Sequence, residues 1–289
     1  MDIVRFKGGL GNQMFQYAFA EALRHRGREV ACNTGFYRNH GDLAPFILQE
    51  VFPDTELNEI GDMEFREWDA KWKLIKQDMH RLEEYEKDIE NQFFYLEREG
   101  GVFDERVFKT KNCVFVGYWQ TEKYFCGIKQ TILERFTFSV KEEKLTEYGN
   151  LLKDNYYSVH IRRGDYLKSY DYFGGICTEQ YYKNAMECIK NRDADAKFVF
   201  FSDDMAWVKC AFGEKEGFLY LDRNEFNDYK DWYDMYLMTR CKGNIVANSS
   251  FSWWGAWLNQ TVGKMVVSPK RWFRKFGMKD IWCDGWMKI

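Results

Sequence analysis

The sequence predicts an α/β protein in which helices cover parallel sheets. After residue 155, short apolar segments alternate regularly with helix-like segments. The chain also opens with a strand-like segment that runs through a glycine turn into another helix-like segment. A polar, charged stretch over 141–155 is typical of a link between two halves. Because 289 residues suffice for two domains of ordinary size, we predict domains over 1–148 and 149–289.

The composition narrows the class of partner and the compartment. A net charge of −3 and an isoelectric point of about 5.9 argue against nucleic acid, which usually meets a basic face. The eight cysteines form no Cys-x-x-Cys pair and no histidine spacing suits a metal, so no metal site is expected. The N-terminus lacks the apolar core of a signal peptide, and no apolar run of about 18 residues could span a membrane. We therefore expect a cytoplasmic protein with reduced thiols and no transmembrane segment.

The first strand is expected over 2–6, and a helix over 12–25 follows a turn that contains three glycines. Glycines let backbone N–H groups approach a ligand closely, and the helix would direct its positive end at the turn. The spacing fails the dinucleotide fingerprint and lacks the lysine of a phosphate-binding P-loop. A plain strand-to-helix turn is the alternative. Asn12 and Gln13 favour a ligand site, because they add side-chain donors at the turn.

The rest of the first half is harder to assign. A strand is expected over 30–33, and a strand, turn and helix over 114–125, continued helically over 128–136. Apolar residues recur at alternating three- and four-residue spacing over about 63–90, which predicts a long amphipathic helix. Such a helix could form a coiled coil or lie on a membrane. Its polar face has mixed charge, so we favour packing on the protein's own core.

The alternation of strand-like and helix-like segments in the second half predicts a Rossmann-like sheet. Right-handed strand–helix–strand crossovers place its strands in parallel. Thr178 is the expected N-cap of the first of its helices. The expected strands span 156–161, 197–201, 218–221, 244–247 and 264–267. The expected helices span 179–191, a short segment after 204, 229–240 and 251–259.

Three polar clusters follow three of these strands, and carboxyl ends of parallel strands meet at one edge, where ligands bind. The first cluster contains His160, Arg162, Arg163 and Asp165. The second contains Ser202, Asp203 and Asp204. The third contains Asn248, Ser249, Ser250, Phe251 and Ser252.

The pattern of these clusters indicates a bound nucleoside diphosphate. Two guanidiniums match phosphate oxygens, and serines at a helix N-terminus form an anion site. An acidic pair repels phosphate, so we assign Asp203 and Asp204 to a sugar or base edge. The arginines and the helix end can neutralise the diphosphate, so a metal is not required. Structural salt bridges for the arginines, and plain helix caps for the serines and for Ser202 and Asp203, are the alternatives.

Five segments, in chain order, closely resemble motifs of the α-1,2-fucosyltransferases, glycosyltransferase family 11. They are residues 7–17 (KGGLGNQMFQY), 117–125 (GYWQTEKYF), 160–166 (HIRRGDY), 201–204 (FSDD) and 248–255 (NSSFSWWG). Residues 32–108 align with no motif. The resemblance implies a GT-B fold, with two Rossmann-like domains and the active site between them. It also implies inverting, metal-independent transfer of L-fucose from GDP-β-L-fucose to the 2-hydroxyl of galactose in an oligosaccharide, by a bacterial member of the family.

The resemblance also implies roles for individual residues. Arg162 would bind the diphosphate with support from Arg163. Asn12 would face the reacting centre from the acceptor-side domain. Asp165 is the candidate for activating the acceptor hydroxyl. The remaining donor-site residues would hold the guanosine and phosphates: His160, Asp203, Asp204, Asn248, Ser249, Ser250, Phe251 and Ser252.

Some choices stay open at the level of sequence. A non-catalytic protein that binds nucleotide sugars or carbohydrates could keep this fold, and a fucosyltransferase of another linkage would carry similar motifs. A lipid-linked acceptor would make any membrane association peripheral. Whether a catalytic base is needed, which native acceptor is used and which oligomer forms are not decided by these residues.

Overall fold

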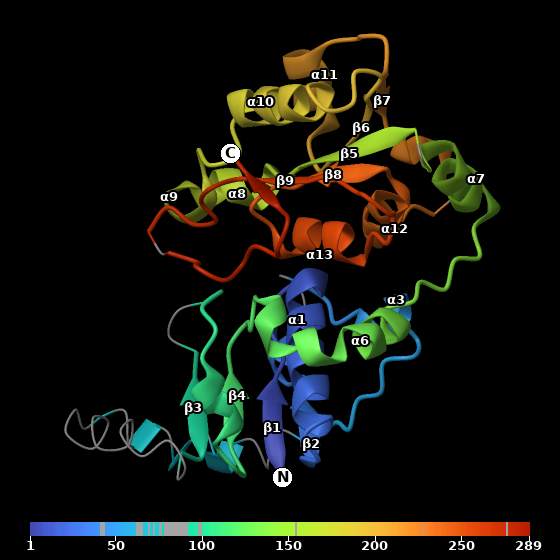
Figure 1. Cartoon of the computed structure of the whole chain (residues 1–289). Coiled ribbons are helices and arrows are strands. Elements are labelled where there is room, and N and C mark those ends of the chain that lie inside the picture. The colour runs from blue at the N-terminus through green and yellow to red at the C-terminus, as the bar shows by residue number, and fades with distance from the viewer. Residues whose placement is uncertain are drawn as a thin grey trace. The chain divides into compact units, whose positions relative to one another are not determined.

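The computed structural model describes residues 1–40, 44–61, 66–68, 70–71, 73–74, 77, 92–97, 100–153, 155–226, 228–275 and 277–289. The chain forms two compact units (Figure 1). The first contains Met1–Thr137 together with Lys279–Ile281, and the second contains Phe138–Met278 together with Trp282–Ile289. The division at 137/138 lies before the predicted boundary at 148/149. Most of the helix predicted over 63–90 lies outside the described residues.

The first unit is built on a parallel sheet with the strand order β2-β1-β4-β3. Its described elements are β1 (Asp2–Arg5), α1 (Leu10–Arg24), β2 (Val30–Asn33), α2 (Phe36–His40), α3 (Leu48–Val51), β3 (Phe94–Leu96), β4 (Val114–Val116) and α6 (Lys129–Arg135), with 3₁₀ turns at Glu105–Phe108, Glu122–Tyr124 and Cys126–Ile128. Helix α1 is buried along most of its length, as a helix with apolar residues on all sides requires. Its Phe19 ring stacks on Trp119 at 4.1 Å.

The second unit is built on a parallel sheet with the order β10-β9-β8-β5-β6-β7. Its strands are β5 (Tyr156–Ile161), β6 (Lys197–Ser202), β7 (Phe218–Tyr220), β8 (Gly243–Ile245), β9 (Val266–Ser268) and β10 (Met287–Lys288). Its helices are α7 (Glu143–Leu152), α8 (Gly164–Lys168), α9 (Tyr170–Phe173), α10 (Glu179–Lys190), α11 (Met205–Phe212), α12 (Trp232–Arg240) and α13 (Ser250–Leu258), with a 3₁₀ turn at Arg223–Glu225.

Helices cover both faces of this second sheet. Along β6, Phe198 and Phe200 pack into one core with α10 and α11. Val199 and Phe201 point to the opposite face and pack with α7 and α12. A continuous apolar run is therefore needed, because each face of the strand is buried. The predicted α/β class, with a GT-B-like pair of Rossmann-like units, is confirmed.

The prediction of a linker over 141–155 is wrong for most of that stretch, because α7 occupies it. Leu145 and Leu152 lie two turns apart on one side of α7, and both are fully buried. They pack with Leu237 and Met238 of α12, which places α7 inside the second unit. The charged residues around the two leucines, Lys141, Glu142, Glu143, Lys144 and Glu147, are exposed or partly exposed and gave the segment its linker-like composition.

Several local predictions are confirmed. Strands β2 and β5 span the predicted residues, and the Thr178 side chain accepts a hydrogen bond from the Tyr181 N–H to cap α10 at 3.2 Å. Strands β3 and β10 and helices α8 and α9 were not predicted. Within the described ranges, no helix combines the length and the apolar character needed to cross a membrane.

Residues 279–281 complete the first unit, although they lie near the far end of the sequence. The Asp280 carboxylate accepts hydrogen bonds from the Phe103 backbone N–H at 2.8 Å and from the Lys123 ammonium at 2.5 Å. The Asp280 N–H donates to the Gly101 carbonyl at 2.8 Å. The contacts with Gly101 and Phe103 fix the loop that precedes β4, and the contact with Lys123 reaches the 3₁₀ turn that follows β4.

Candidate active site

The three predicted clusters follow three neighbouring strands, β8, β5 and β6. The register places Ile161, the last residue of β5, beside Ser202, the last residue of β6. Val159 lies beside Ile245, the last residue of β8. The clusters therefore share the carboxyl edge of the second unit's sheet, as the sequence predicts.

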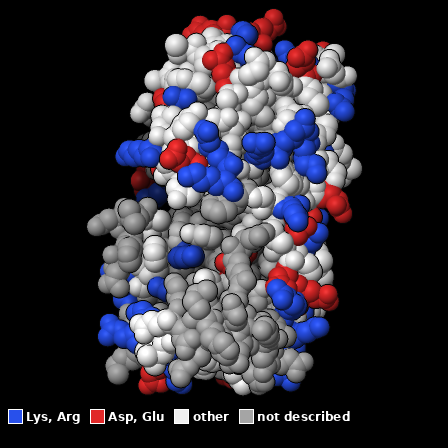
Figure 2. Space-filling view, turned by 90° about the vertical axis from the view of Figure 1, so that its left-hand side faces the viewer, with Lys and Arg blue, Asp and Glu red and all other residues white. Residues whose placement is uncertain are grey.

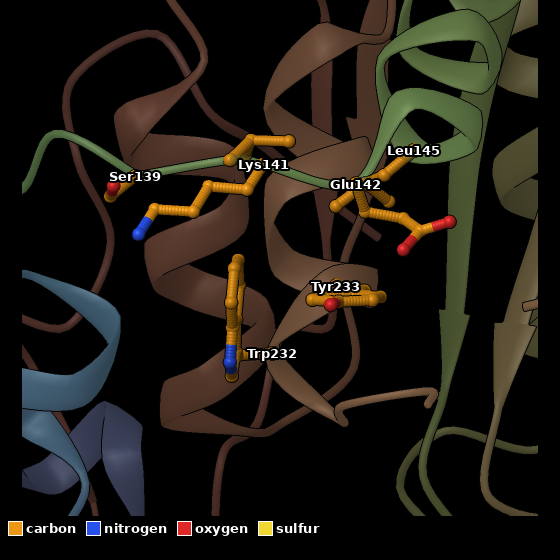
Figure 3. A pocket seen from close by; sticks show the side chains of 7 residues that line it. Ser139, Lys141, Glu142, Leu145, Trp232 and Tyr233 are labelled. Atoms are coloured by element: carbon orange, nitrogen blue, oxygen red, sulfur yellow. The ribbon is translucent and has the colours of Figure 1, made fainter. Parts of the chain in front are cut away.

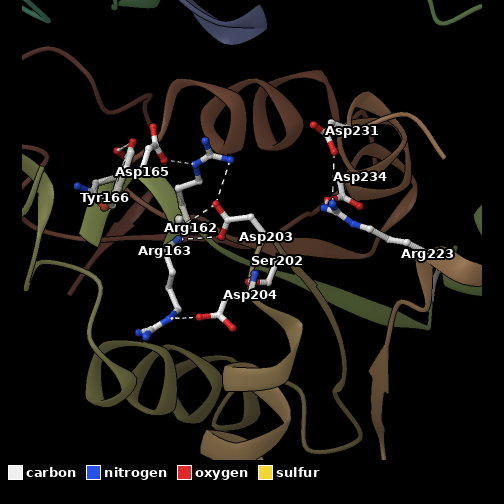
Figure 4. A network of polar contacts seen from close by, with 12 residues as sticks. Arg162, Arg163, Asp165, Tyr166, Ser202, Asp203, Asp204, Arg223, Asp231 and Asp234 are labelled. Carbon is white, nitrogen blue, oxygen red and sulfur yellow. Dashed lines mark hydrogen bonds and ion pairs between the residues drawn. The ribbon is translucent and has the colours of Figure 1, made fainter. Parts of the chain in front are cut away.

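Both arginines of the first cluster pair with carboxylates, three of which converge there (Figure 4). Arg162 lies 2.8 Å from Asp165 and 3.1 Å from Asp203. Arg163 lies 3.0 Å from Asp204, and its guanidinium stacks over the Trp207 ring at 3.9 Å. The ion pairs that the sequence offered as an alternative are thus present. They surround guanidiniums that remain partly exposed, so they do not exclude a phosphate role.

Asp203 and Asp204 also bind backbone groups. Asp203 accepts hydrogen bonds from the Arg163 and Gly164 N–H groups at 2.9 and 3.1 Å, which fixes the turn after β5. Asp204 caps α11 by accepting from the Trp207 N–H at 3.1 Å, so the helix cap is Asp204 rather than Asp203. The hydrogen bond from Arg163 lowers the pKa of Asp204 below its ordinary value. A contact of either carboxylate with a sugar or base stays a prediction.

His160 is a buried, neutral imidazole within this edge. It is only 5% exposed, and its ring stacks with Phe251 at 5.5 Å. Burial, and then the nearby charges of Arg162 and Arg223, lower its pKa to about 3. Its Nδ1 has no hydrogen-bond partner among the described residues. A buried ring nitrogen without a partner is unfavourable by about 1–3 kcal/mol, and a bound ligand could satisfy it.

The third cluster divides into structural and available groups. Asn248 donates to the Phe173 and Trp272 carbonyls at 3.3 and 3.0 Å. The Ser252 hydroxyl accepts from the Ala247 N–H at 2.9 Å. Ser249 occupies the N-cap position of α13, but its side chain makes no capping hydrogen bond. The first N–H groups of α13, beside the partly buried Ser250, are therefore not satisfied by a serine cap, contrary to the capping alternative.

Asn12 lies at the carboxyl edge of the first unit's own sheet, in the first turn of α1. Its side-chain oxygen accepts from the Gln120 amide at 2.8 Å. Gly8 has φ of +84°, and a Cβ there would lie 2.5 Å from the Asn12 amide nitrogen, so glycine is required. Gln13, predicted as a donor at the turn, instead donates to the Gly8 and Pro45 carbonyls. It stabilises the glycine turn rather than facing a ligand.

Sequence reasoning missed Glu97, which follows β3 at the same edge. One carboxylate oxygen accepts from the Tyr118 and Trp119 N–H groups at 2.6 and 3.1 Å. The other oxygen is buried and has no hydrogen-bond partner among the described residues. Burial raises the pKa of Glu97 to about 7, although the two N–H groups and Lys7 oppose the rise. Glu97 lies in the region without a motif, so no pattern in the sequence indicated it.

Arg223 was also missed, and it adds a third cation near His160. Its guanidinium lies 2.6 Å from the buried Asp234 and 3.3 Å from Asp231 (Figure 4). Tyr229 donates a hydrogen bond to the other Asp234 oxygen. Arg223 is thus fixed by two carboxylates, and its positive charge contributes to the lowered pKa of His160.

A separate cavity of about 280 Å³ lies in the second unit, between the segment before α7 and the start of α12 (Figure 3). It is lined by Ser139, Val140, Lys141, Glu142, Leu145, Trp232 and Tyr233. No predicted site residue lines it. The described part of the chain also holds no group of three or more His, Cys, Asp or Glu residues that could bind a metal ion.

Comparison with known proteins identifies the family. Residues 2–289 match Glycosyl transferase family 11. An Escherichia coli alpha-1,2-colitosyltransferase is 31% identical over 99% of this chain and 98% of its own length. The E. coli O-antigen biosynthesis glycosyltransferase WbnK is 29% identical over 98% of both chains. Human galactoside alpha-(1,2)-fucosyltransferase 1 is 25% identical over 87% of this chain and 63% of its own length. This chain belongs to glycosyl transferase family 11 and is a glycosyltransferase.

Proposed function

We propose that the chain transfers L-fucose from GDP-β-L-fucose to the 2-hydroxyl of a galactose residue in a glycan, with inversion and without a required metal. The observation that carries the proposal is the paired guanidiniums of Arg162 and Arg163 beside the start of α13. Both lie at the carboxyl edge of one parallel sheet, next to the buried His160. Cations and a helix N-terminus together favour a diphosphate.

The ion pairs of Arg162 are weak enough for its guanidinium to exchange a carboxylate partner for a phosphate. Arg162 is 38% exposed on its side chain, so its pairs with Asp165 and Asp203 are screened and contribute little to stability. A diphosphate brings more charge than one carboxylate and can accept two parallel N–H bonds from a guanidinium. Arg162 would therefore leave Asp165 and bind the phosphate, with Arg163 in support.

The nucleoside would be held beside the diphosphate by residues of the same edge. The Nδ1 atom of His160, which has no partner among the described residues, would form a hydrogen bond with the guanosine. The Phe251 ring, which stacks with His160, would offer an apolar face to the guanine base. Ser249 and Ser250 would present the start of α13 to phosphate. Asn248, Ser252, Asp203 and Asp204 fix the loops that carry these groups through the chain's own hydrogen bonds. A contact of Asp203 or Asp204 with the guanosine stays part of the proposal.

The chemical step is a single displacement. The acceptor hydroxyl oxygen forms a bond to the sugar's anomeric carbon while the bond from that carbon to the diphosphate oxygen breaks, and GDP leaves with the electron pair. The hydroxyl proton passes to a base, for which Asp165 is the proposed group once Arg162 has turned to the phosphate. Asn12 is proposed to orient the acceptor. Stabilisation of the leaving GDP by the arginines lowers the demand on the base.

Colitose is a second candidate for the transferred sugar. The E. coli relative named as an alpha-1,2-colitosyltransferase matches nearly the whole chain. A donor carrying this sugar would use the same diphosphate and nucleoside contacts, so the difference would lie in the groups around the sugar ring. The experiment must therefore supply both donors.

The test is incubation of the full chain with GDP-fucose or GDP-colitose and a panel of β-galactosides, with products identified by mass spectrometry and linkage analysis. Transfer of fucose to a galactose 2-hydroxyl is the expected result. Transfer of colitose alone would replace the donor and keep the reaction class. Donor binding with no transfer to any acceptor and no hydrolysis would favour a non-catalytic binding protein. Absence of binding to both donors would overturn the site.

A further inference from the structure

A group of exposed apolar side chains lies beside the proposed donor site. Leu167, Tyr170 and Tyr172 of α8 and α9 are 53%, 51% and 48% exposed. They fall within six consecutive residues and belong to the few large hydrophobic side chains that the described chain exposes. Exposed apolar groups that gather in one place indicate a contact surface rather than chance exposure.

Five exposed cations accompany them: Lys168, Lys270, Arg271, Arg274 and Lys275. Within the described residues, none of the five forms an ion pair with a carboxylate. Segments 166–175 and 269–275 contain one acidic residue, Asp171. This positive surface contrasts with the chain's net charge of −3. Lys and Arg groups lie close together on this face of the second unit (Figure 2).

The two segments form one surface, because their side chains and backbones are in contact. The Arg274 guanidinium lies over the Tyr170 ring at 4.9 Å, and the Lys275 ammonium lies over the Tyr172 ring at 5.1 Å. The Arg274 N–H donates to the Tyr172 carbonyl at 3.0 Å. We call the five cations with Leu167, Tyr170 and Tyr172 the basic-aromatic surface.

We propose that the basic-aromatic surface docks the chain on an anionic phospholipid bilayer. Lys and Arg are attracted to anionic headgroups, while tyrosine and leucine side chains favour the headgroup boundary. The attraction of each cation to such a surface falls off within a Debye length, so it is strongest at low salt. Five cations against one carboxylate therefore suffice for reversible binding, to which the three apolar side chains add.

The surface is tied to the donor site by direct contacts, so docking would bring that site to the membrane. Asn248, which precedes α13, donates to the carbonyls of Phe173 and Trp272, one from each segment of the surface. Tyr166 donates to the Asn248 carbonyl at 2.9 Å and stacks on Phe173 at 4.5 Å. A glycan acceptor held at a membrane would then meet the transferase in two dimensions. This consequence rests on the proposed function, whereas the docking itself does not.

The test is flotation of the full chain with vesicles of phosphatidylcholine alone or with 30% phosphatidylglycerol, at low and high salt. At low salt we expect binding at least tenfold stronger to the anionic vesicles, and loss of that difference at high salt. A variant with Lys270→Glu, Arg271→Glu and Lys275→Glu should bind anionic vesicles at least tenfold more weakly. Equal binding to both vesicle types, or no binding to either, overturns the proposal.

A matched variant with Lys197→Glu, Lys209→Glu and Lys215→Glu changes the net charge equally on exposed lysines outside the surface. We expect it to bind vesicles like the wild type. If it loses binding as strongly, general charge rather than this surface is responsible, and the proposal fails. Both variants should transfer sugar to a water-soluble acceptor at the wild-type rate, so loss of docking is distinguishable from failure of the proposed function. A change of sedimentation in the first variant, without a change in vesicle binding, would assign the surface to a second copy instead.

Discussion

The carboxyl edges of the two sheets hold different polar groups. At the second unit's edge, the guanidiniums of Arg162 and Arg163 lie 2.8–3.1 Å from carboxylates. At the first unit's edge, the Glu97 carboxylate is held by two backbone N–H groups, and Asn12 and Gln120 add neutral amides. The same parallel topology therefore prepares one edge for a phosphate. The other edge suits a neutral, hydroxyl-bearing partner, because it offers neutral amides and a carboxyl group whose pKa burial raises to about 7.

The largest expected effect tests the second unit's edge. Arg162→Ala should abolish transfer and weaken GDP binding by at least about 2 kcal/mol, because it removes a charge-assisted contact. Lys7→Ala at the first unit's edge should leave GDP binding unchanged. Calorimetry with GDP measures both. Unchanged GDP affinity in Arg162→Ala would contradict the phosphate assignment.

Asp165→Asn is the matched control for Arg162. It removes the ion pair at 2.8 Å but keeps the guanidinium. GDP should bind this variant at least as tightly as the wild type, because Arg162 no longer has to leave a carboxylate. The transfer rate should fall if Asp165 is the base. An equal loss of GDP affinity in both variants would show that the pair itself, rather than the guanidinium, organises the site.

The next effect tests the charge of the first unit's edge through pH. The pKa of Glu97 is raised by burial from 4.5 to about 7, so the folded chain keeps a proton that the unfolded chain has lost. The contribution of Glu97 to the free energy of unfolding is therefore largest below pH 4.5, and it is lost as the pH rises from 4.5 to about 7. The loss should be about 1–2 kcal/mol after allowance for partial exposure.

Urea unfolding of Glu97→Gln from pH 4 to 8 measures this contribution. The variant should lack the Glu97 part of the pH dependence, because its amide oxygen can still accept the two N–H bonds and does not ionise. Burial also raises the pKa of Asp234 in the second unit to about 6, but both chains keep that group. The difference between the two curves therefore reports Glu97 alone, and the same pH dependence in both would show that Glu97 ionises alike in the folded and unfolded chains.

A smaller effect is expected at Asp280, which stabilises the first unit without belonging to either edge. Asp280→Asn keeps the size of the side chain but weakens its bonds to Lys123 and the Phe103 N–H. Unfolding stability should fall by about 1 kcal/mol, while GDP affinity should not change. Thermal unfolding with and without GDP checks both, and a change in GDP affinity would link the two units energetically.

Removal of divalent metal ions is expected to have no effect on the rate of transfer. If Arg162, Arg163 and the start of α13 neutralise the diphosphate, transfer should continue at the same rate in EDTA. Assaying product formation with EDTA, and again after adding manganese, tests this. Full loss of activity that manganese restores would reassign Asp203 and Asp204 as metal ligands.

A segment's structure can be predicted from the sequence when its own apolar pattern shows which of its side chains are buried. Strand β5 was predicted because all its later side chains are buried, and Arg162 and Arg163 because charged side chains at a strand end are conspicuous. Helix α7 was missed because its few buried leucines stand among charges. Glu97 was missed because β3 is three residues long, and only the N–H groups of a distant turn give the carboxylate its role. Contacts between distant segments leave no local pattern.

The return of residues 279–281 to the first unit has a consequence for biosynthesis. A domain usually folds as it leaves the ribosome, before later domains are made. Here the loop before β4 gains the Asp280 contacts only after residues 138–278 of the second unit have been translated. The first unit is thus begun before the second but completed only after most of the second has been made, and a nascent chain halted before residue 279 would hold it in a less stable form.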